Sequence, residues 1–323
     1  MKAPTGSKPW WSWLGPVLGL VIVYFFFVIV GPESFASVRT LETIARQTAI
    51  VGTAALGMTL VIVLGGIDLS VGSIVAMTSV VVALALKGGA GPLTAILLAT
   101  LAGALTGFVN GSLITRLKVA PFIVTLGTLL LIRGVAKGLG KEQKVDAPIT
   151  WLVELLSSLP AERRFLIVPP GVWMLALLAV VTAVLLRYTR LGAHVVAIGS
   201  NEKTARLCGV AVERVKVVVY TLSGALAGLT GVLQFSRLTV GDPTVAVGLE
   251  LDVIAAVVIG GGSLSGGEGT VTGTLVGAFI MTVIRAGTSQ MGLPNWVQEI
   301  VTGTIIVAAV AIDRWRHRRS EAS

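Results

Sequence analysis

The chain has 323 residues, of which 54% are hydrophobic and 13% are charged, and its formal net charge is +9. Soluble domains usually contain about a quarter of charged residues, so this composition excludes an ordinary soluble protein and indicates a polytopic membrane protein. A single cysteine, Cys208, excludes a disulfide framework, and the two histidines, His194 and His317, lie too far apart to suggest a metal site.

Ten apolar runs follow one another along the chain, most of them close to the ~20 residues that a helix needs to cross a core of roughly 30 Å. They cover residues 13–30, 44–64, 71–86, 92–115, 121–138, 167–187, 215–236, 251–262, 270–290 and 296–312. The first run lacks a small-residue cleavage site, so we interpret it as a retained span and not as a signal peptide. The expected fold is an all-α polytopic membrane protein with about ten transmembrane helices.

The distribution of basic residues predicts the orientation. More than half of the 25 Lys and Arg residues lie in the two tails and in segments 116–118 and 187–216. Because loops rich in Lys and Arg stay in the cytoplasm, we expect a multi-pass protein of a bacterial inner membrane with both termini cytoplasmic. The basic tail suits contact with anionic membrane lipid better than with nucleic acid.

A polar stretch interrupts the apolar pattern between the second and third runs, Gly65-Gly66-Ile67-Asp68-Leu69-Ser70-Val71-Gly72-Ser73. An Asp at the centre of a membrane helix costs about 2.5 to 3.5 kcal/mol on insertion scales, so Asp68 needs a setting lined by water or protein. Two roles stay open. Asp68 or Ser70 caps the helix that resumes near Val71, or Asp68, Ser70 and Ser73 line a pathway at a helix break, as in transporters.

A repeat relates the two halves of the chain. Asp68-Leu69-Ser70-Val71 is answered 174 positions later by Asp242-Pro243-Thr244-Val245. Five spans in each half then predict a five-plus-five inverted repeat with broken helices, which adds Asp242 and Thr244 to the candidate pathway. A second match, between residues 65–70 and 260–265, has an offset of 195 that nothing else shares. We interpret it as a coincidence of loop composition.

The basic segment between the sixth and seventh runs contains a short predicted helix. Ser200 or Asn201 can cap its start, and Gly209 can end it. So short a helix is unstable alone in water, so it should dock on a partner protein or, alternatively, on its own bundle. The candidate docking residues are Asn201, Glu202, Ala205, Arg206 and Gly209.

Three segments together resemble the permease subunits of ATP-binding-cassette importers for ribose and other simple sugars. They are residues 65–73, the loop 197–202 with Ala205 and Gly209, and residues 250–261 continuing through Leu264-Ser265-Gly266-Gly267. The resemblance extends from about residue 40 to 312. Loop 139–166 and both tails match no motif of the family, which leaves the particular sugar unassigned.

This resemblance implies a ten-helix permease that works as a pair of membrane subunits, identical or different. A periplasmic sugar-binding protein would deliver the monosaccharide, and a separate ATPase docked on the cytoplasmic loop would drive transport. The chain would hold no cofactor, because ATP and Mg belong to the ATPase. Its single permease domain would comprise tail 1–12, first half 13–138, external loop 139–166, second half 167–312 with coupling loop 188–214, and tail 313–323.

Leu264-Ser265-Gly266-Gly267-Glu268 looks like the signature sequence of ABC ATPases, but the chain has no phosphate-binding GxxxxGK[ST] loop. We therefore interpret this run as a turn between spans. A secondary transporter with broken helices stays open as an alternative, with Asp68 as its carboxylate. An integral-membrane enzyme lacks any paired carboxylates or Ser-His arrangement within the spans.

The remaining polar residues of the spans have structural interpretations beside functional ones. Asn110 is expected to make an interhelical hydrogen bond before it binds sugar. Arg133 and Arg285 are expected to reach the membrane interface as anchors. Glu250 and Asp252 begin the eighth span, where they stabilise a helix dipole or, alternatively, contact the arriving binding protein.

Overall fold

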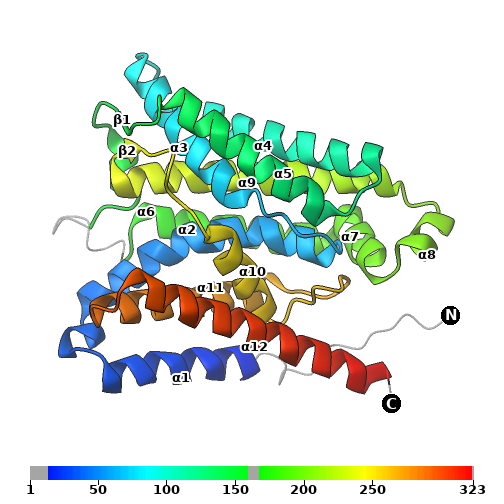
Figure 1. The fold of residues 1–323 in the computed structure, drawn as a ribbon. Helices are drawn as coiled ribbons and strands as arrows, with labels where there is room; N and C mark the ends of the chain where they lie inside the picture. The colour runs from blue at the N-terminus through cyan, green and yellow to red at the C-terminus, as the bar shows by residue number, and fades with distance from the viewer. Residues whose placement is uncertain (1–13, 159–166, 322–323) are drawn as a thin grey trace.

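The computed structural model describes residues 14–158 and 167–321, which are almost entirely helical (Figure 1). The twelve α-helices of this part are α1 (Leu14–Val30), α2 (Val38–Val63), α3 (Val71–Lys87), α4 (Pro92–Leu117), α5 (Pro121–Leu139), α6 (Pro170–Tyr188), α7 (Arg190–Ser200), α8 (Glu202–Leu207), α9 (Val212–Leu238), α10 (Leu249–Ile259), α11 (Val271–Gln290) and α12 (Asn295–Glu321). Two 3-10 helices, η2 (Glu33–Ala36) and η3 (Trp151–Leu155), lie in the links.

Six of these helices are long and apolar enough to cross a membrane, namely α2, α4, α5, α6, α9 and α11. Helices α1, α3 and α12 contain shorter apolar stretches. Helix α10 has only 11 residues and is therefore about 16 Å long, too short for a core of roughly 30 Å. Residues 251–262 therefore do not cross the core as one continuous helix, and α10 is a half-helix in that part of the sequence.

Helix α2 forms the centre of the bundle, with 89% of its most apolar window buried, whereas α4, α5 and α6 have only 22% of theirs buried. The exposed side chains of these three helices are mostly apolar, such as Leu97, Leu130 and Val180. Apolar side chains that no protein covers at these positions suit lipid.

Glycines hold α4 directly against α9. A Cβ atom on Gly103 would lie 2.8 Å from Gly228 Cα, and one on Gly107 would lie 3.1 Å from Gly224 Cα. Small residues at four-residue spacing let membrane helices approach closely. Two hydroxyl pairs join α2 to α11 in addition, because Thr48 and Thr282 are 2.7 Å apart at their oxygens and Thr59 and Thr274 are 2.8 Å apart.

The two ends of the bundle differ. Figure 1 shows α7 and α8 at one end, where α12 also finishes, and a small hairpin at the other. In that hairpin β1 (Val145–Asp146) pairs antiparallel with β2 (Val240–Gly241), with Val145 opposite Gly241. The loop after α5 is thereby fastened to the link between α9 and α10.

Enlarging a glycine between α4 and α9 is expected to destabilise the bundle. Gly107→Leu would drive a side chain into the Tyr220 carbonyl and Gly224, and overpacking of this kind costs about 1 to 3 kcal/mol or more. We expect a lower melting temperature and a loss of monodisperse protein in detergent chromatography. Gly127→Leu on α5, where nothing lies within 4 Å, should behave like the unaltered chain. Equal behaviour of both variants would contradict the packing described.

Candidate functional site

Helix α2 ends inside the bundle because Gly65 adopts a left-handed conformation, with φ of +88°. The Gly65 and Gly66 amides turn back onto the carbonyls of Ile62 and Val61, both at 2.9 Å. This is a glycine-terminated helix end that satisfies the last carbonyls. The chain then runs as a non-helical link, residues 64–70, before α3 starts at Val71, the residue expected from the sequence.

Asp68 organises this link. Its side chain is completely buried, and Oδ1 accepts hydrogen bonds from the Ser70 backbone N–H (2.9 Å) and the Ser70 hydroxyl (2.6 Å). Neither residue caps α3 in the expected way, because Ser70, the N-cap, makes no side-chain cap bond. Asp68 instead closes a turn over its own link, an alternative that short polar side chains offer the backbone.

Two neighbouring helices hold the link in place. Asn110 on α4 donates from Nδ2 to Ser70 Oγ at 2.9 Å, which confirms the expected interhelical hydrogen bond. Thr125 on α5 donates to the Ile67 carbonyl at 3.2 Å. Sequence reasoning missed Thr125, since threonines in membrane helices commonly bond only their own backbone.

Polar atoms around the link retain capacity for a hydroxylated ligand or water. Within the described residues, no hydrogen-bond partner is present for four buried oxygens, Asp68 Oδ2, Ser73 Oγ, Asn110 Oδ1 and Tyr220 Oη. Tyr220 on α9 reaches the link, because a Cβ on Gly66 would lie 2.5 Å from its hydroxyl. Buried polar groups are normally paired, so these atoms mark the link as the candidate site of the chain. A lone tyrosine among small and apolar residues was the overlooked sequence signal.

The second Asp turn predicted from the repeat has the same local geometry. Asp242 Oδ1 accepts from the Thr244 N–H (2.9 Å) and hydroxyl (2.7 Å), as Asp68 does from Ser70. Asp242 Oδ2 lies 3.5 Å from the Lys144 ammonium. This turn stands beside the β1–β2 hairpin, at the end of the bundle opposite α8 (Figure 1).

Charged side chains gather at the start of α10. Asp252 is fully buried and pairs with Arg285 of α11 at 2.5 Å, while Arg133 of α5 donates to the Pro243 (3.1 Å) and Val245 (2.6 Å) carbonyls. The expected role of Arg133 and Arg285 as interface anchors is therefore wrong, because both bind groups of the α9–α10 region. Burial also disfavours direct contact between Asp252 and an arriving protein. Such a contact through Glu250, which is only partly covered, stays a prediction.

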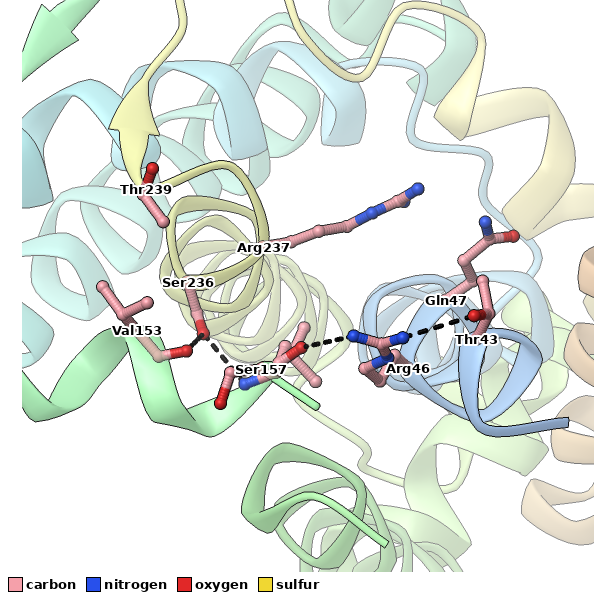
Figure 2. Close-up of a pocket in the computed structure, with 9 residues that line it drawn as sticks. Thr43, Arg46, Gln47, Val153, Ser157, Ser236, Arg237 and Thr239 are labelled. Carbon is pink, nitrogen blue, oxygen red and sulfur yellow. Dashed lines mark hydrogen bonds between the residues drawn. The ribbon is translucent and has the colours of Figure 1, made fainter. Parts of the chain in front are cut away.

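A cavity of about 310 Å³ opens near the same end. It lies between the first turns of α2, the end of η3 and the last turn of α9. In Figure 2, Arg46 bonds toward Thr43 and η3, while Arg237 extends away from α9 into the space beside Gln47. Arg46 donates to the Leu156 carbonyl (3.4 Å) and Ser158 (3.3 Å). Two guanidinium groups, those of Arg46 and Arg237, thus line this cavity.

At the opposite end, the segment after α6 forms two helices, α7 and α8, where the sequence predicted one. Asn201 caps α8 by accepting the Thr204 N–H at 2.9 Å, and Gly209, with φ of +83°, ends it. Both features agree with the prediction. Ala205, however, is only 4% exposed and packs in the core of its own chain, so its expected insertion into a partner is wrong.

Ion pairs tie α8 to the start of α9. Glu202 contacts Lys216 at 2.8 Å and Arg206 at 3.3 Å, and Arg206 also contacts Glu213 at 2.6 Å. The hydrogen bond from Lys216, more than that from Arg206, holds the pKa of the Glu202 carboxyl below its ordinary value. The Glu202–Lys216 pair therefore stabilises the packing of α8 on α9 fully at a pH above the ordinary Glu pKa. This stabilisation is lost as the pH falls through the lowered pKa of Glu202. These residues also line a cavity of about 440 Å³ that reaches Lys118.

The outward face of α8 is different from what the sequence suggested. Leu207 is 89% exposed, beside exposed Lys203 and Cys208. Because Ala205 is buried, Leu207 is the one apolar side chain that α8 leaves exposed. No group of His, Cys, Asp and Glu side chains suited to a metal ion is present among residues 14–158 and 167–321.

Comparison with known proteins assigns the family. A family model described as "Branched-chain amino acid transport system / permease component" matches residues 40–310. The chain belongs to this permease family. It is a multi-pass membrane subunit of an ABC importer and not an enzyme, because in such importers ATP hydrolysis resides on a separate subunit.

Relatives of this permease match it along nearly its whole length. The ribose import permease protein of Bacillus subtilis is 42% identical over 93% of this chain and 92% of the relative, and that of Escherichia coli is 38% identical over 94% of each. The fructose import permease protein of Rhizobium meliloti is 35% identical over 93% of this chain and 84% of the relative. A solved chain of an inward-facing ABC transporter aligns with 94% of this permease, along 98% of its own length, with a TM-score of 0.53 and 14% sequence identity. At this identity the likeness is one of fold alone.

Two replacements of Asp68 should distinguish the effect of its hydrogen bonds on stability from the effect of its charge. Asp68→Asn keeps an acceptor for the Ser70 N–H, so we expect the thermal stability of the purified permease to change little. Asp68→Leu leaves the Ser70 N–H and O–H unpaired at about 1 to 3 kcal/mol for each buried group, so its melting temperature should fall clearly. Thermal unfolding in detergent makes the comparison. A Leu variant as stable as the Asn variant would show that the turn contributes nothing to the link.

Proposed function

We propose that this permease forms the translocation pathway of a monosaccharide importer, for ribose or a similar simple sugar. The observation that carries the proposal is identity of 34 to 42% over more than 90% of the chain with relatives named for import of ribose, L-arabinose and fructose. The family description names branched-chain amino acids, but these relatives favour a sugar. The uncharged hydroxyl and amide oxygens of Ser73, Asn110 and Tyr220 beside Asp68 also suit sugar hydroxyls.

We place α7 and α8 in the cytoplasm, together with both termini and the basic tail 313–323. Loops rich in Lys and Arg support this orientation, and Figure 1 draws the end of α12 on the side of α8. The β1–β2 hairpin and loop 139–166 then face the periplasm. The halves 13–138 and 167–312 form an inverted five-plus-five repeat, supported by the matching turns at Asp68 and Asp242.

A periplasmic sugar-binding protein delivers the sugar at the end that carries Arg46, Arg237 and Glu250. A second permease subunit, identical or related, completes the pathway. The resemblance to importers of simple sugars supports both partners. Asp68, Ser70, Ser73 and Asn110 line the cytoplasmic half of the pathway at the α2–α3 link, and Asp242 and Thr244 line its external half.

The separate ATPase seats on α8 through Leu207, with Asn201, Glu202 and Arg206 keeping the helix rigid. Gly209 directs the chain from α8 into α9. Burial of Ala205, with the ion pairs of Glu202 and Arg206 to the start of α9, holds α8 against the bundle. Displacement of α8 by the ATPase is therefore passed to the bundle.

Leu207→Asp should abolish association with the ATPase, because it places a charge at the centre of the proposed contact while leaving the buried side of α8 intact. Ile149→Asp is a matched control, since Ile149 is 88% exposed beside β1 at the opposite end. Co-purification with the ATPase makes the measurement. Unchanged association of the Leu207→Asp variant would show that α8 is not the docking element.

Sugar should bind weakly to the permease alone. The described bundle has few convergent polar side chains apart from the Asp68 link, and tight recognition of several hydroxyls needs a matching set. Isothermal calorimetry with ribose should give a dissociation constant weaker than about 1 mM, because selection then resides with the binding protein. A micromolar constant would contradict this account of selectivity.

Reconstitution tests the function itself. Proteoliposomes that contain the permease and its ATPase should take up labelled ribose, L-arabinose or fructose only with internal ATP and external binding protein. Labelled leucine is the negative control. Uptake driven by a proton gradient without ATP would establish the secondary-transporter alternative, and uptake of leucine alone would overturn the assignment to sugars.

A further inference from the structure

Three segments that are far apart in the sequence meet at four glycines, which we call the glycine junction. They are Gly65 after α2, Gly199 near the end of α7, and Gly266 and Gly267 in the link between α10 and α11. The Gly267 N–H donates to the Val63 carbonyl at 2.8 Å. The run that looked like an ATPase signature is thus part of an internal contact, and Figure 1 shows this orange link extending toward the end that carries α7.

The contact is made mainly by backbone, with the Ser200 hydroxyl beside Gly267. A Cβ on Gly199 would collide with the Val63 carbonyl and lie 2.5 Å from Gly267 N. One on Gly266 would lie 2.7 Å from Gly199 O and 2.9 Å from Gly65 Cα. Since real Cβ contacts essentially never fall below 3.0 Å, no larger residue fits without displacing one of the segments. Close-packed interiors transmit displacement, and at Gly199 and Gly266 the atoms in the way are backbone atoms.

The junction joins the segments that matter for transport. On one side, α7 and α8 share the buried core through Val195, Ile198 and Ala205. On another side, Gly65 opens the link that holds Asp68. The third segment leads directly into α10 and α11, which carry Asp252 and Arg285.

The link after α2 and the link after α10 begin in the same way. The sequence match between residues 65–70 and 260–265, which we interpreted as a coincidence, therefore corresponds to a shared backbone structure. Gly261, with φ of +89°, ends α10 as Gly65 ends α2, because the Gly261 and Gly262 amides turn back at 2.9 and 2.8 Å onto Val258 and Val257. Two helix ends of the same kind therefore lead into the glycine junction, α2 directly through Gly65 and α10 through the link that contains Gly266 and Gly267.

We propose that the glycine junction is the positioning contact that passes movement of α8 to the Asp68 link and to α10 at the same time. This inference rests on the proposed function, in which an ATPase displaces α8. Displacement of α7 and α8 moves Gly199, which moves the end of α2 and the α10–α11 link together. The junction thus couples ATP hydrolysis to opening of the pathway.

Alanine variants test the contact against matched glycines. Gly266→Ala, at φ of +86°, is compared with Gly261→Ala, at φ of +89°, where nothing lies within 4 Å. Gly199→Ala, in a helix, is compared with Gly138→Ala on α5, where nothing lies within 4 Å. The two glycines of the first pair have nearly equal φ, and both glycines of the second pair lie in helices, so the main difference within each pair is the contact.

The measurements are ATPase association, ATP hydrolysis and sugar uptake in proteoliposomes. For Gly266→Ala and Gly199→Ala we expect association and basal hydrolysis within about two-fold of the unaltered complex, but sugar transported per ATP reduced about ten-fold or more, within the usual range of coupling. The control variants should transport normally. A structural role alone would lower assembly and hydrolysis in parallel, and that outcome, or normal transport, overturns the proposal.

Hydrogen exchange in the unaltered complex gives a test that needs no variant. Exchange of the peptide 260–270 should change on ATP binding together with the peptide 195–209, because the Gly267 amide reports the junction. Change confined to 195–209 would contradict the coupling. Failure of the unaltered permease to bind any ATPase would instead refute the proposed function, so the two failures are distinct.

Discussion

A chain that stops being helical inside a membrane has to satisfy its own backbone, and the link between α2 and α3 does so through Asp68. Its Oδ1 accepts both the N–H and the hydroxyl of Ser70, and Asn110 and Thr125 fasten the same link from α4 and α5. Unpaired groups at this depth would each cost several kcal/mol. Because these bonds fix where α3 begins, they also determine how α3 meets α9 and where the remaining buried oxygens lie. The helix break is stable only because these hydrogen bonds satisfy its backbone. The buried oxygens that remain unpaired around it are available to a hydroxylated ligand.

The rest of the architecture places that link between two different surfaces. One end carries Arg46, Arg237 and the Asp252–Arg285 pair, and the other carries α7 and α8 with their ion pairs. Glycines replace side chains wherever helices or turns must touch directly, as between α4 and α9 and at the glycine junction. A bundle built in this way is stiff at selected contacts and surrounded by apolar side chains at lipid-facing positions. Such stiffness lets a small displacement at α8 reach the link that contains Asp68.

Sequence reasoning predicted those features that local chemistry determines. The start of α3 at Val71, the cap at Asn201, the left-handed Gly209 and the bond made by Asn110 all follow from residue type and neighbours. It failed where tertiary packing decides the direction of a side chain. Arg133 and Arg285 can reach an interface or an internal partner with equal ease, and Ala205 can pack outward or inward; only the assembled bundle selects between them. The half-length of α10 was hidden because its apolar residues continue into the glycine link, and the role of Gly266 was hidden because contact between distant turns leaves no periodic pattern.

The central claim is that the Asp68 link is part of a pathway whose exposure follows the state of α8. The direct measurement is the reactivity of a single cysteine at Leu69, a partly covered residue, in a chain whose exposed Cys208 is replaced by serine. A membrane-impermeant thiol reagent is applied from each side of proteoliposomes that hold the complex with its ATPase and binding protein. We expect Leu69→Cys to react from the cytoplasmic side in one nucleotide state and to become protected in another. Identical reactivity in every state of a complex that still transports sugar would contradict it.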